Sequence, residues 1–133
     1  MAELETDDAP WPQGKPKEIG FKFRGYRLTD DRRPTFLYEY KGVRVEDFPN
    51  PLEKVNSATL VRKLTFTTGG DRKNLWFRVA TGSPRSLGDG WYQTGDAKIR
   101  VESAGEPVIR GGALIAPVKF QDGKAELTLE YQW

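Results

Sequence analysis

The chain has 133 residues and a formal net charge of +2, with 21 Lys and Arg against 19 Asp and Glu. It contains no histidine and no cysteine, which excludes Ser-His-Asp and Cys-His nucleophiles, disulfide bonds and the usual zinc and blue-copper ligand sets. The net charge is too small to indicate a nucleic-acid partner, and no apolar run approaches the roughly 20 residues of a membrane span.

Residues 1–17 are expected to form a flexible tail or linker before one domain over residues 18–133. Acidic residues crowd the first eight positions, and Pro10, Pro12 and Pro16 follow, a composition that resists regular structure. Such a segment buries too little apolar surface to offset its ordering entropy, so its deletion should leave the domain folded unless Trp11 docks. The start at Met1 lacks the basic and apolar pattern of a signal peptide. It fits a cytoplasmic protein, or a chain from which a leader or upstream domain was removed.

From residue 19 onward, apolar and polar residues alternate with period two, which is typical of strands with one buried face. An Asp-rich turn is expected over 29–34, a proline-punctuated loop over 47–57, and a mobile glycine-rich loop over 82–90. The predicted strands cover 19–28, 35–46 with a tight turn at Lys41-Gly42, 60–67, 75–80, 98–102, 107–110, 114–120 and 125–132.

No segment repeats apolar residues at helical spacing over three turns, so no long helix is predicted. Strands about every ten residues, separated by Gly and Pro turns, predict an all-β fold. We expect an antiparallel β-sandwich of about eight to ten strands, jelly-roll or supersandwich-like, with an open β-barrel as the alternative. The predicted core consists of Phe21, Phe23, Val43, Val45, Leu64, Phe66, Leu75, Phe77, Val79, Val118, Phe120, Leu127 and Leu129.

Trp76 is the leading candidate for ligand binding. Its neighbours Leu75 and Phe77 take the core face, so alternation places Trp76 outward beside Arg78. A large aromatic ring on an open sheet face can stack on the apolar face of a sugar, and an arginine can hydrogen-bond the hydroxyls. The alternative is that both faces of the sheet are covered, in which case Trp76 belongs to the core.

Two further pairs are ligand-binding candidates. Trp91 and Tyr92 follow the glycine-rich loop, and because adjacent strand residues point to opposite faces, at most one of them is expected in the core. Arg24 and Tyr26 lie where basic and aromatic residues interleave over 21–28. That pattern overlaps the RNA-recognition motif only at Arg24-Gly25-Tyr26, and the chain has no basic excess to support binding to single strands.

No catalytic residue and no metal ligand set is assigned. The carboxylates of the chain could supply a catalytic pair or a structural calcium site in a turn, but no spacing is diagnostic of either. Most of them are expected to be solvated, and Asp30-Asp31 fits an Asx turn. No cofactor is therefore predicted. The carboxylates considered are Asp30, Asp31, Glu39, Glu46, Asp47 and Asp89.

Several segments together resemble a β-rich accessory module of large bacterial multidomain proteins that combine a sugar-dehydrogenase-like propeller with c-type cytochrome segments. The resemblance covers about residue 19 to the end of the chain. It implies an extracytoplasmic module, periplasmic or secreted, attached to carbohydrate-processing machinery, and it carries over no active-site residue. The chain lacks Cys-x-x-Cys-His, so it holds no heme. The resembling segments are Phe23–Leu28, Arg33–Tyr40, Val45–Asp47, Leu75–Gly82, Asp89–Tyr92 and Lys119–Ala125.

These observations predict a non-catalytic carbohydrate-binding or accessory module of a sugar-active enzyme, with a polysaccharide or oligosaccharide as its partner. The first alternative is a structural domain that docks adjacent domains of a larger polypeptide through exposed aromatic side chains. The second is a carboxylate-based polysaccharide lyase or glycosidase.

Overall fold

The computed structural model describes residues 1–4, 11–13, 20–54, 57–70 and 72–133. These residues form twelve β-strands and contain no helix, which confirms the all-β prediction with more strands than expected. The strands are β1 (Ala2–Glu3), β2 (Phe21–Leu28), β3 (Pro34–Tyr40), β4 (Val43–Lys54), β5 (Ser57–Thr67), β6 (Leu75–Ala80), β7 (Arg85–Gly88), β8 (Trp91–Thr94), β9 (Ala97–Ser103), β10 (Val108–Arg110), β11 (Ala113–Pro117) and β12 (Lys124–Gln132).

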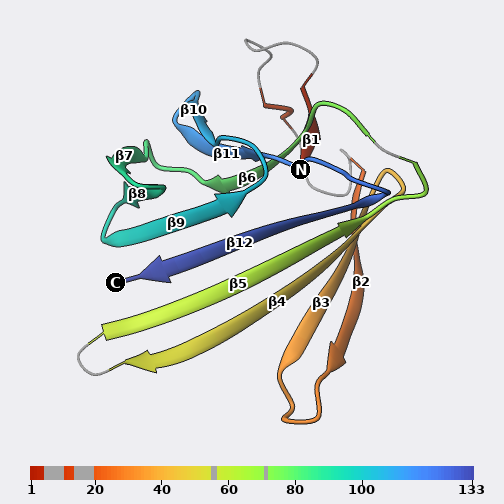
Figure 1. Ribbon diagram of the computed structural model, residues 1–133, viewed down its shortest axis with the longest axis horizontal. Coiled ribbons are helices and arrows are strands. Elements are labelled where there is room, and N and C mark those ends of the chain that lie inside the picture. Colours follow the sequence, from red (N-terminus) through yellow and green to blue (C-terminus); the bar gives the residue numbers. More distant parts are fainter. Residues whose placement is uncertain (5–10, 14–19, 55–56, 71) are drawn as a thin grey trace.

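Two antiparallel sheets make up the fold. The larger has eight strands in the order β2-β3-β4-β5-β12-β9-β8-β7, and the smaller has four in the order β1-β6-β11-β10. The small sheet lies over one part of the large sheet, whereas the β2–β3 hairpin projects away from it (Figure 1). The sheets do not close on each other, so the molecule is the predicted β-sandwich and not a barrel.

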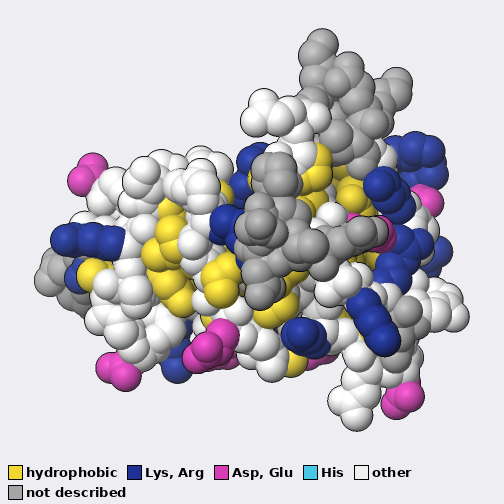
Figure 2. Space-filling view, turned by 90° about the horizontal axis from the view of Figure 1, so that it is seen from above, with side chains coloured by type: hydrophobic (Ala, Val, Ile, Leu, Met, Phe, Trp, Pro, Cys, Tyr) yellow, Lys and Arg dark blue, Asp and Glu magenta, His cyan; other side chains and the backbone are white. Residues whose placement is uncertain are grey.

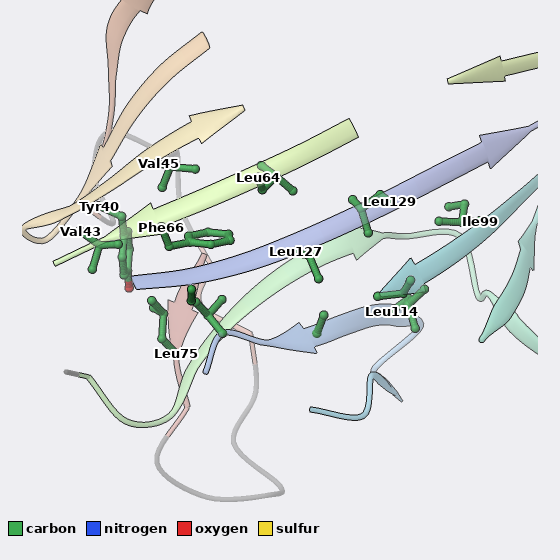
Figure 3. Close-up of a cluster of buried hydrophobic side chains, with 14 residues drawn as sticks. Tyr40, Val43, Val45, Leu64, Phe66, Leu75, Ile99, Leu114, Leu127 and Leu129 are labelled. Atoms are coloured by element: carbon green, nitrogen blue, oxygen red, sulfur yellow. The ribbon is translucent and has the colours of Figure 1, made fainter. Parts of the chain in front are cut away.

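The core lies between the two sheets. Leu75 from β6 and Leu114 from β11 face Phe66, Leu127 and neighbouring side chains of the large sheet (Figure 3). Eight of the predicted core residues are buried: Val43, Val45, Leu64, Phe66, Leu75, Val118, Leu127 and Leu129. Four others are half-buried against this cluster: Phe21, Phe77, Val79 and Phe120. Alternation along each strand therefore identified the inward faces correctly.

Phe23 is wrongly predicted as core, because its side chain is 59% exposed. Its strand phase is right: Phe23 pairs with Tyr38, and their ring centres are 5.5 Å apart. The residue lies farther out along the hairpin than Phe21, where the small sheet no longer covers the large one (Figure 1).

The predicted loop over 47–57 is also wrong, since β4 continues to Lys54 and β5 begins at Ser57, with 55–56 outside the described residues. The β3–β4 ladder ends at Asp47, so beyond that point β4 pairs only with β5 among the described residues. Proline lacks an N–H and is tolerated where a strand has a free edge, which explains how Pro49 and Pro51 fit within β4.

Two further segments contain strands where none was expected. β1 lies within the predicted tail: Ala2 pairs with Trp76, and the Leu4 amide donates to the Asn74 carbonyl at 2.8 Å. The predicted boundary near residue 17 falls outside the described residues. The loop predicted over 82–90 contains β7, which pairs with β8. The described part of the chain includes no helix long and apolar enough to cross a membrane.

Candidate functional site

The candidate ligand residues do not come together in one place. The structure puts them on three surfaces: Trp76 and Arg78 on β6, Trp91 and Tyr92 on β8, and Arg24 and Tyr26 on β2. β6 belongs to the small sheet, whereas β2 and β8 lie near opposite edges of the large sheet. The three pairs must therefore be assessed separately.

The β2 pair lies on the projecting hairpin. Arg24 already has a partner, because its Nε donates to Glu39 Oε2 at 2.9 Å. Tyr26 is 62% exposed. Between Phe23 and Gly25 the register shifts, so the bulge there alters the alternation on which the sequence prediction for this pair relied.

The β8 pair splits between the two faces of the large sheet, in agreement with the expectation that at most one residue is core. Tyr92 packs against the main core and pairs with Ile99, and burial raises the pKa of its hydroxyl, with a further contribution from the charge of Glu106. Trp91 pairs with Arg100 and therefore lies on the opposite face.

The β6 pair lies on the face of the small sheet that points away from the large sheet, as alternation predicted. This face is not open. Trp76 is half-buried against a second apolar cluster formed by Ala2, Leu4, Ala113 and Ile115. Trp76 is thus part of a partly covered apolar surface, and its ring is not an open face on which a sugar can stack.

Trp11 and Arg110 complete this surface. The sequence prediction named neither as a ligand-binding residue, although it considered that Trp11 could dock on the domain. The guanidinium carbon of Arg78 lies 5.2 Å from the centre of the Trp11 ring, and that of Arg110 lies 5.6 Å from the Trp76 ring. Both distances are within the range of a cation–π contact. Arg110 pairs with Ala113 across the Gly111-Gly112 turn, a hairpin signal that could have placed it on this face.

A groove of about 890 Å³ lies on this surface and is lined by Leu4, Trp11 and the two segments 81–83 and 110–113. The two segments are held together, because the Ser83 amide donates to the Gly112 carbonyl at 3.0 Å. Figure 2 shows the molecule from the side of the small sheet, with basic side chains next to hydrophobic ones. We call this feature the Trp11–Arg110 groove.

The described lining of the Trp11–Arg110 groove is positively charged. Arg78 and Arg110 line the groove, and none of its described lining residues carries a carboxylate. The Nη1 atom of Arg110 is buried and has no hydrogen-bond partner among the described residues. Burial, and then the nearby charge of Arg78, lower the pKa of the Met1 amino group to about 6.

Asp47 is the one buried carboxylate among the described residues, although most carboxylates were expected to be solvated. It follows Val43 and Val45 on the inward face of β4, and its Oδ2 lies 2.6 Å from Arg62 Nη2. Burial by itself lowers the pKa of Arg62, but the hydrogen bonds and charge of Asp47 outweigh this and raise it. The pair is an internal ion pair of the large sheet, and neither residue is among those that line the Trp11–Arg110 groove.

The described residues contain no group of three or more Asp or Glu side chains that could hold a metal ion. No family model, no curated protein and no solved structure matches this chain. The resemblance to accessory modules of bacterial multidomain proteins therefore stays a prediction.

Proposed function

We propose that this chain is a non-catalytic carbohydrate-binding or accessory module of a sugar-active enzyme, acting outside the cytoplasm. One observation supports the proposal above all others: the Trp11–Arg110 groove combines the indole of Trp11 with two guanidiniums, Arg78 and Arg110, that have no carboxylate partner among the described residues. The extracytoplasmic and bacterial setting rests on the sequence resemblance alone.

The groove offers the two kinds of contact that a saccharide needs. Indole surface at Trp11 suits the apolar C–H faces of a pyranose, and arginine N–H groups suit its hydroxyl and acidic oxygens. The size of the groove falls within the roughly 300–1,000 Å³ typical of small-ligand sites. Contacts of this kind give weak binding, about micromolar to millimolar in dissociation constant.

Calorimetric titration with soluble β-glucan, mannan, xylan and oligogalacturonate tests the proposal. Trp11→Ala should abolish binding of whichever glycan the chain takes, and Trp91→Ala, which removes an indole outside the groove, should leave it unchanged. Trp76 is less suitable for this test because its ring is part of the apolar cluster. If no glycan binds, or if Trp91→Ala and not Trp11→Ala removes binding, the proposed site is wrong.

A second candidate function is docking of an adjacent domain of the same polypeptide. β2 is an edge strand, and three of its large apolar side chains are exposed: Phe23 at 59%, Tyr26 at 62% and Leu28 at 55%. An exposed apolar edge can pair with an extended strand from outside the domain. Sedimentation velocity of a polypeptide that contains this chain and the adjacent domain tests this proposal. If Tyr26→Glu lowers the sedimentation coefficient, the two domains have separated, which supports docking through β2. An unchanged sedimentation coefficient argues against it.

A further inference from the structure

Arg78 and Arg110 differ from the other arginines in what they contact. Most arginines of the described chain have carboxylate partners, for example Arg27 with Glu46 at 3.0 Å and Arg72 with Glu3 at 2.8 Å. Arg78 and Arg110 contact indole rings instead, and no ion pair joins either to a carboxylate among the described residues. The groove therefore keeps two positive charges that the described residues do not neutralise.

The hydrogen-bonding capacity of Arg110 is also incomplete. Its Nη1 is shielded from solvent yet lacks an acceptor among the described residues, which is unusual because buried polar groups are nearly always hydrogen-bonded. A guanidinium that lies over an indole uses its flat face for that contact. Its N–H groups point outward in the plane of the guanidinium, and the edge formed by Nε and Nη2, which does not include the shielded Nη1, can donate two parallel hydrogen bonds to a carboxylate.

The remaining described residues of the groove are uncharged. The described lining includes the hydroxyl-bearing residues Thr81 and Ser83, the backbone of Gly111 and Gly112, and apolar surface from Ile115. A wholly apolar ligand would leave both guanidiniums unpaired, and a small inorganic anion would leave the indole and apolar surface uncovered. The complementary ligand carries a carboxylate on a ring rich in hydroxyl groups.

We propose that the Trp11–Arg110 groove selects acidic saccharides, with Arg110 of β10 receiving the carboxylate of a uronic acid unit and Arg78 supporting it from β6, which β11 separates from β10. This inference rests on the proposed carbohydrate-binding function and adds the class of sugar. It also identifies Arg110 as a specificity-determining residue.

The test compares a soluble oligogalacturonate with its fully methyl-esterified form, which keeps the rings and hydroxyls and removes the charge. Calorimetry on the full chain should give a dissociation constant at least about tenfold lower for the acid, as expected for a charge-assisted hydrogen-bonded pair. Arg110→Gln and Arg78→Gln should each weaken binding of the acid by about tenfold or more and leave the ester little changed. Arg100→Gln removes an arginine from the outer face of the large sheet and should have no effect.

The outcomes separate the two proposals. Equal binding of acid and ester would overturn the selection of acidic saccharides and leave carbohydrate binding intact. Absence of binding to these and to the neutral glycans would overturn both. Should Arg110→Gln fail to fold, Arg78→Gln and the comparison of the two ligands on the unaltered chain still decide the matter, because neither depends on that variant.

Discussion

Single residues with left-handed backbones shape the turns of this fold, and Gly123 is the most constrained of them. It has a φ of +76°, and a Cβ at this position would lie 2.7 Å from the Thr68 carbonyl oxygen. The turn is fixed on both sides, since Gln121 and Lys124 exchange backbone hydrogen bonds and the Thr68 amide donates to the Gly123 carbonyl at 2.9 Å. The turn that leads into β12, which contacts Thr68 just after β5, therefore needs glycine for both conformation and space.

We expect Gly123→Ala to destabilise the protein more than Gly95→Ala. Both residues have positive φ, so each substitution carries a conformational cost of about 1–2 kcal/mol. Only Gly123 adds a steric clash, about 1–3 kcal/mol more, because Gly95 has nothing within 4 Å of the added Cβ. Urea unfolding of both variants measures the difference, and equal losses would show that the clash relaxes without cost.

The Asp47–Arg62 pair allows a second test at the residue scale. Asp47→Ala removes the only carboxylate that contacts Arg62 among the described residues, and should cost about 2–3 kcal/mol. We place this below the cost for a fully buried pair because the Arg62 side chain is 28% exposed. The double substitution Asp47→Leu/Arg62→Met should recover most of the loss, since it leaves no buried charge. If the double variant is as unstable as Asp47→Ala, the loss does not come from an unpaired buried charge. The hydrogen-bonded contact between Asp47 and Arg62 itself would then stabilise the fold.

At the scale of the element, β1 is the strand whose role changes most between sequence and structure. Ala2 and Leu4 are buried at 0% and 4% exposure, and Arg72 Nη1 holds Glu3 at 2.8 Å. β1 extends the small sheet, and the side chains of Ala2 and Leu4 belong to the apolar cluster against which Trp76 packs. Its described residues bury apolar surface that a solvated tail would leave exposed.

Leu4→Ala should therefore cost about 2–3 kcal/mol, since it removes buried methyl groups. Leu28→Ala is the matched control: that side chain is 55% exposed, so its truncation should change stability by no more than about 0.5 kcal/mol. Deletion of residues 1–17 should lower the melting temperature as well, in contrast to the expectation from sequence. If the deletion leaves the melting temperature unchanged, residues 1–17 are dispensable for folding, as the sequence predicted.

The Met1 amino group predicts a pH dependence for a chain that starts at this residue. Its pKa is about 6 in the folded state against 8.0 for an ordinary amino terminus, so the unfolded chain binds more protons between these values. Stability should rise from pH 6 to pH 8, by at most about 2–3 kcal/mol, and be lost again as the pH falls. No histidine titrates in this window. Thermal melts of an N-terminally acetylated chain should show no rise in stability between pH 6 and pH 8. If the acetylated chain shows the same rise, a titratable group other than the Met1 amino group causes it.

At the scale of the whole molecule, one apolar core joins the two sheets. Phe66 of β5 and Phe77 of β6 meet edge to face across the sandwich, with ring centres 6.1 Å apart. The β2–β3 hairpin lies outside this contact and projects from the body (Figure 1). The sheets are therefore expected to unfold together.

Phe66→Ala should cost about 3–5 kcal/mol, a large share of the stability of a domain of this size. Phe66 is fully buried, whereas Phe23→Ala removes a ring that is 59% exposed and should cost about 1 kcal/mol or less. Circular dichroism and tryptophan fluorescence should report the same transition in both variants. Separate transitions for the two probes would show that the small sheet unfolds independently.

The sequence by itself determined the strand class and which residues of most strands face inward, because alternation is a property of neighbouring residues along one chain. Val43, Leu64 and Leu127 are buried for this reason. The same reasoning placed Trp76 and Arg78 on the face opposite Leu75.

Only the tertiary structure decided which faces are covered, because coverage depends on segments far apart in the chain. Phe23 has the strand phase of a core residue but no sheet above it, and Pro49 continues a strand because the pairing of β4 with β3 stops at Asp47. The groove has the same origin. Trp11, Arg78 and Arg110 come from three distant segments, and no local pattern places two guanidiniums that lack a carboxylate partner among the described residues against the rings of Trp11 and Trp76.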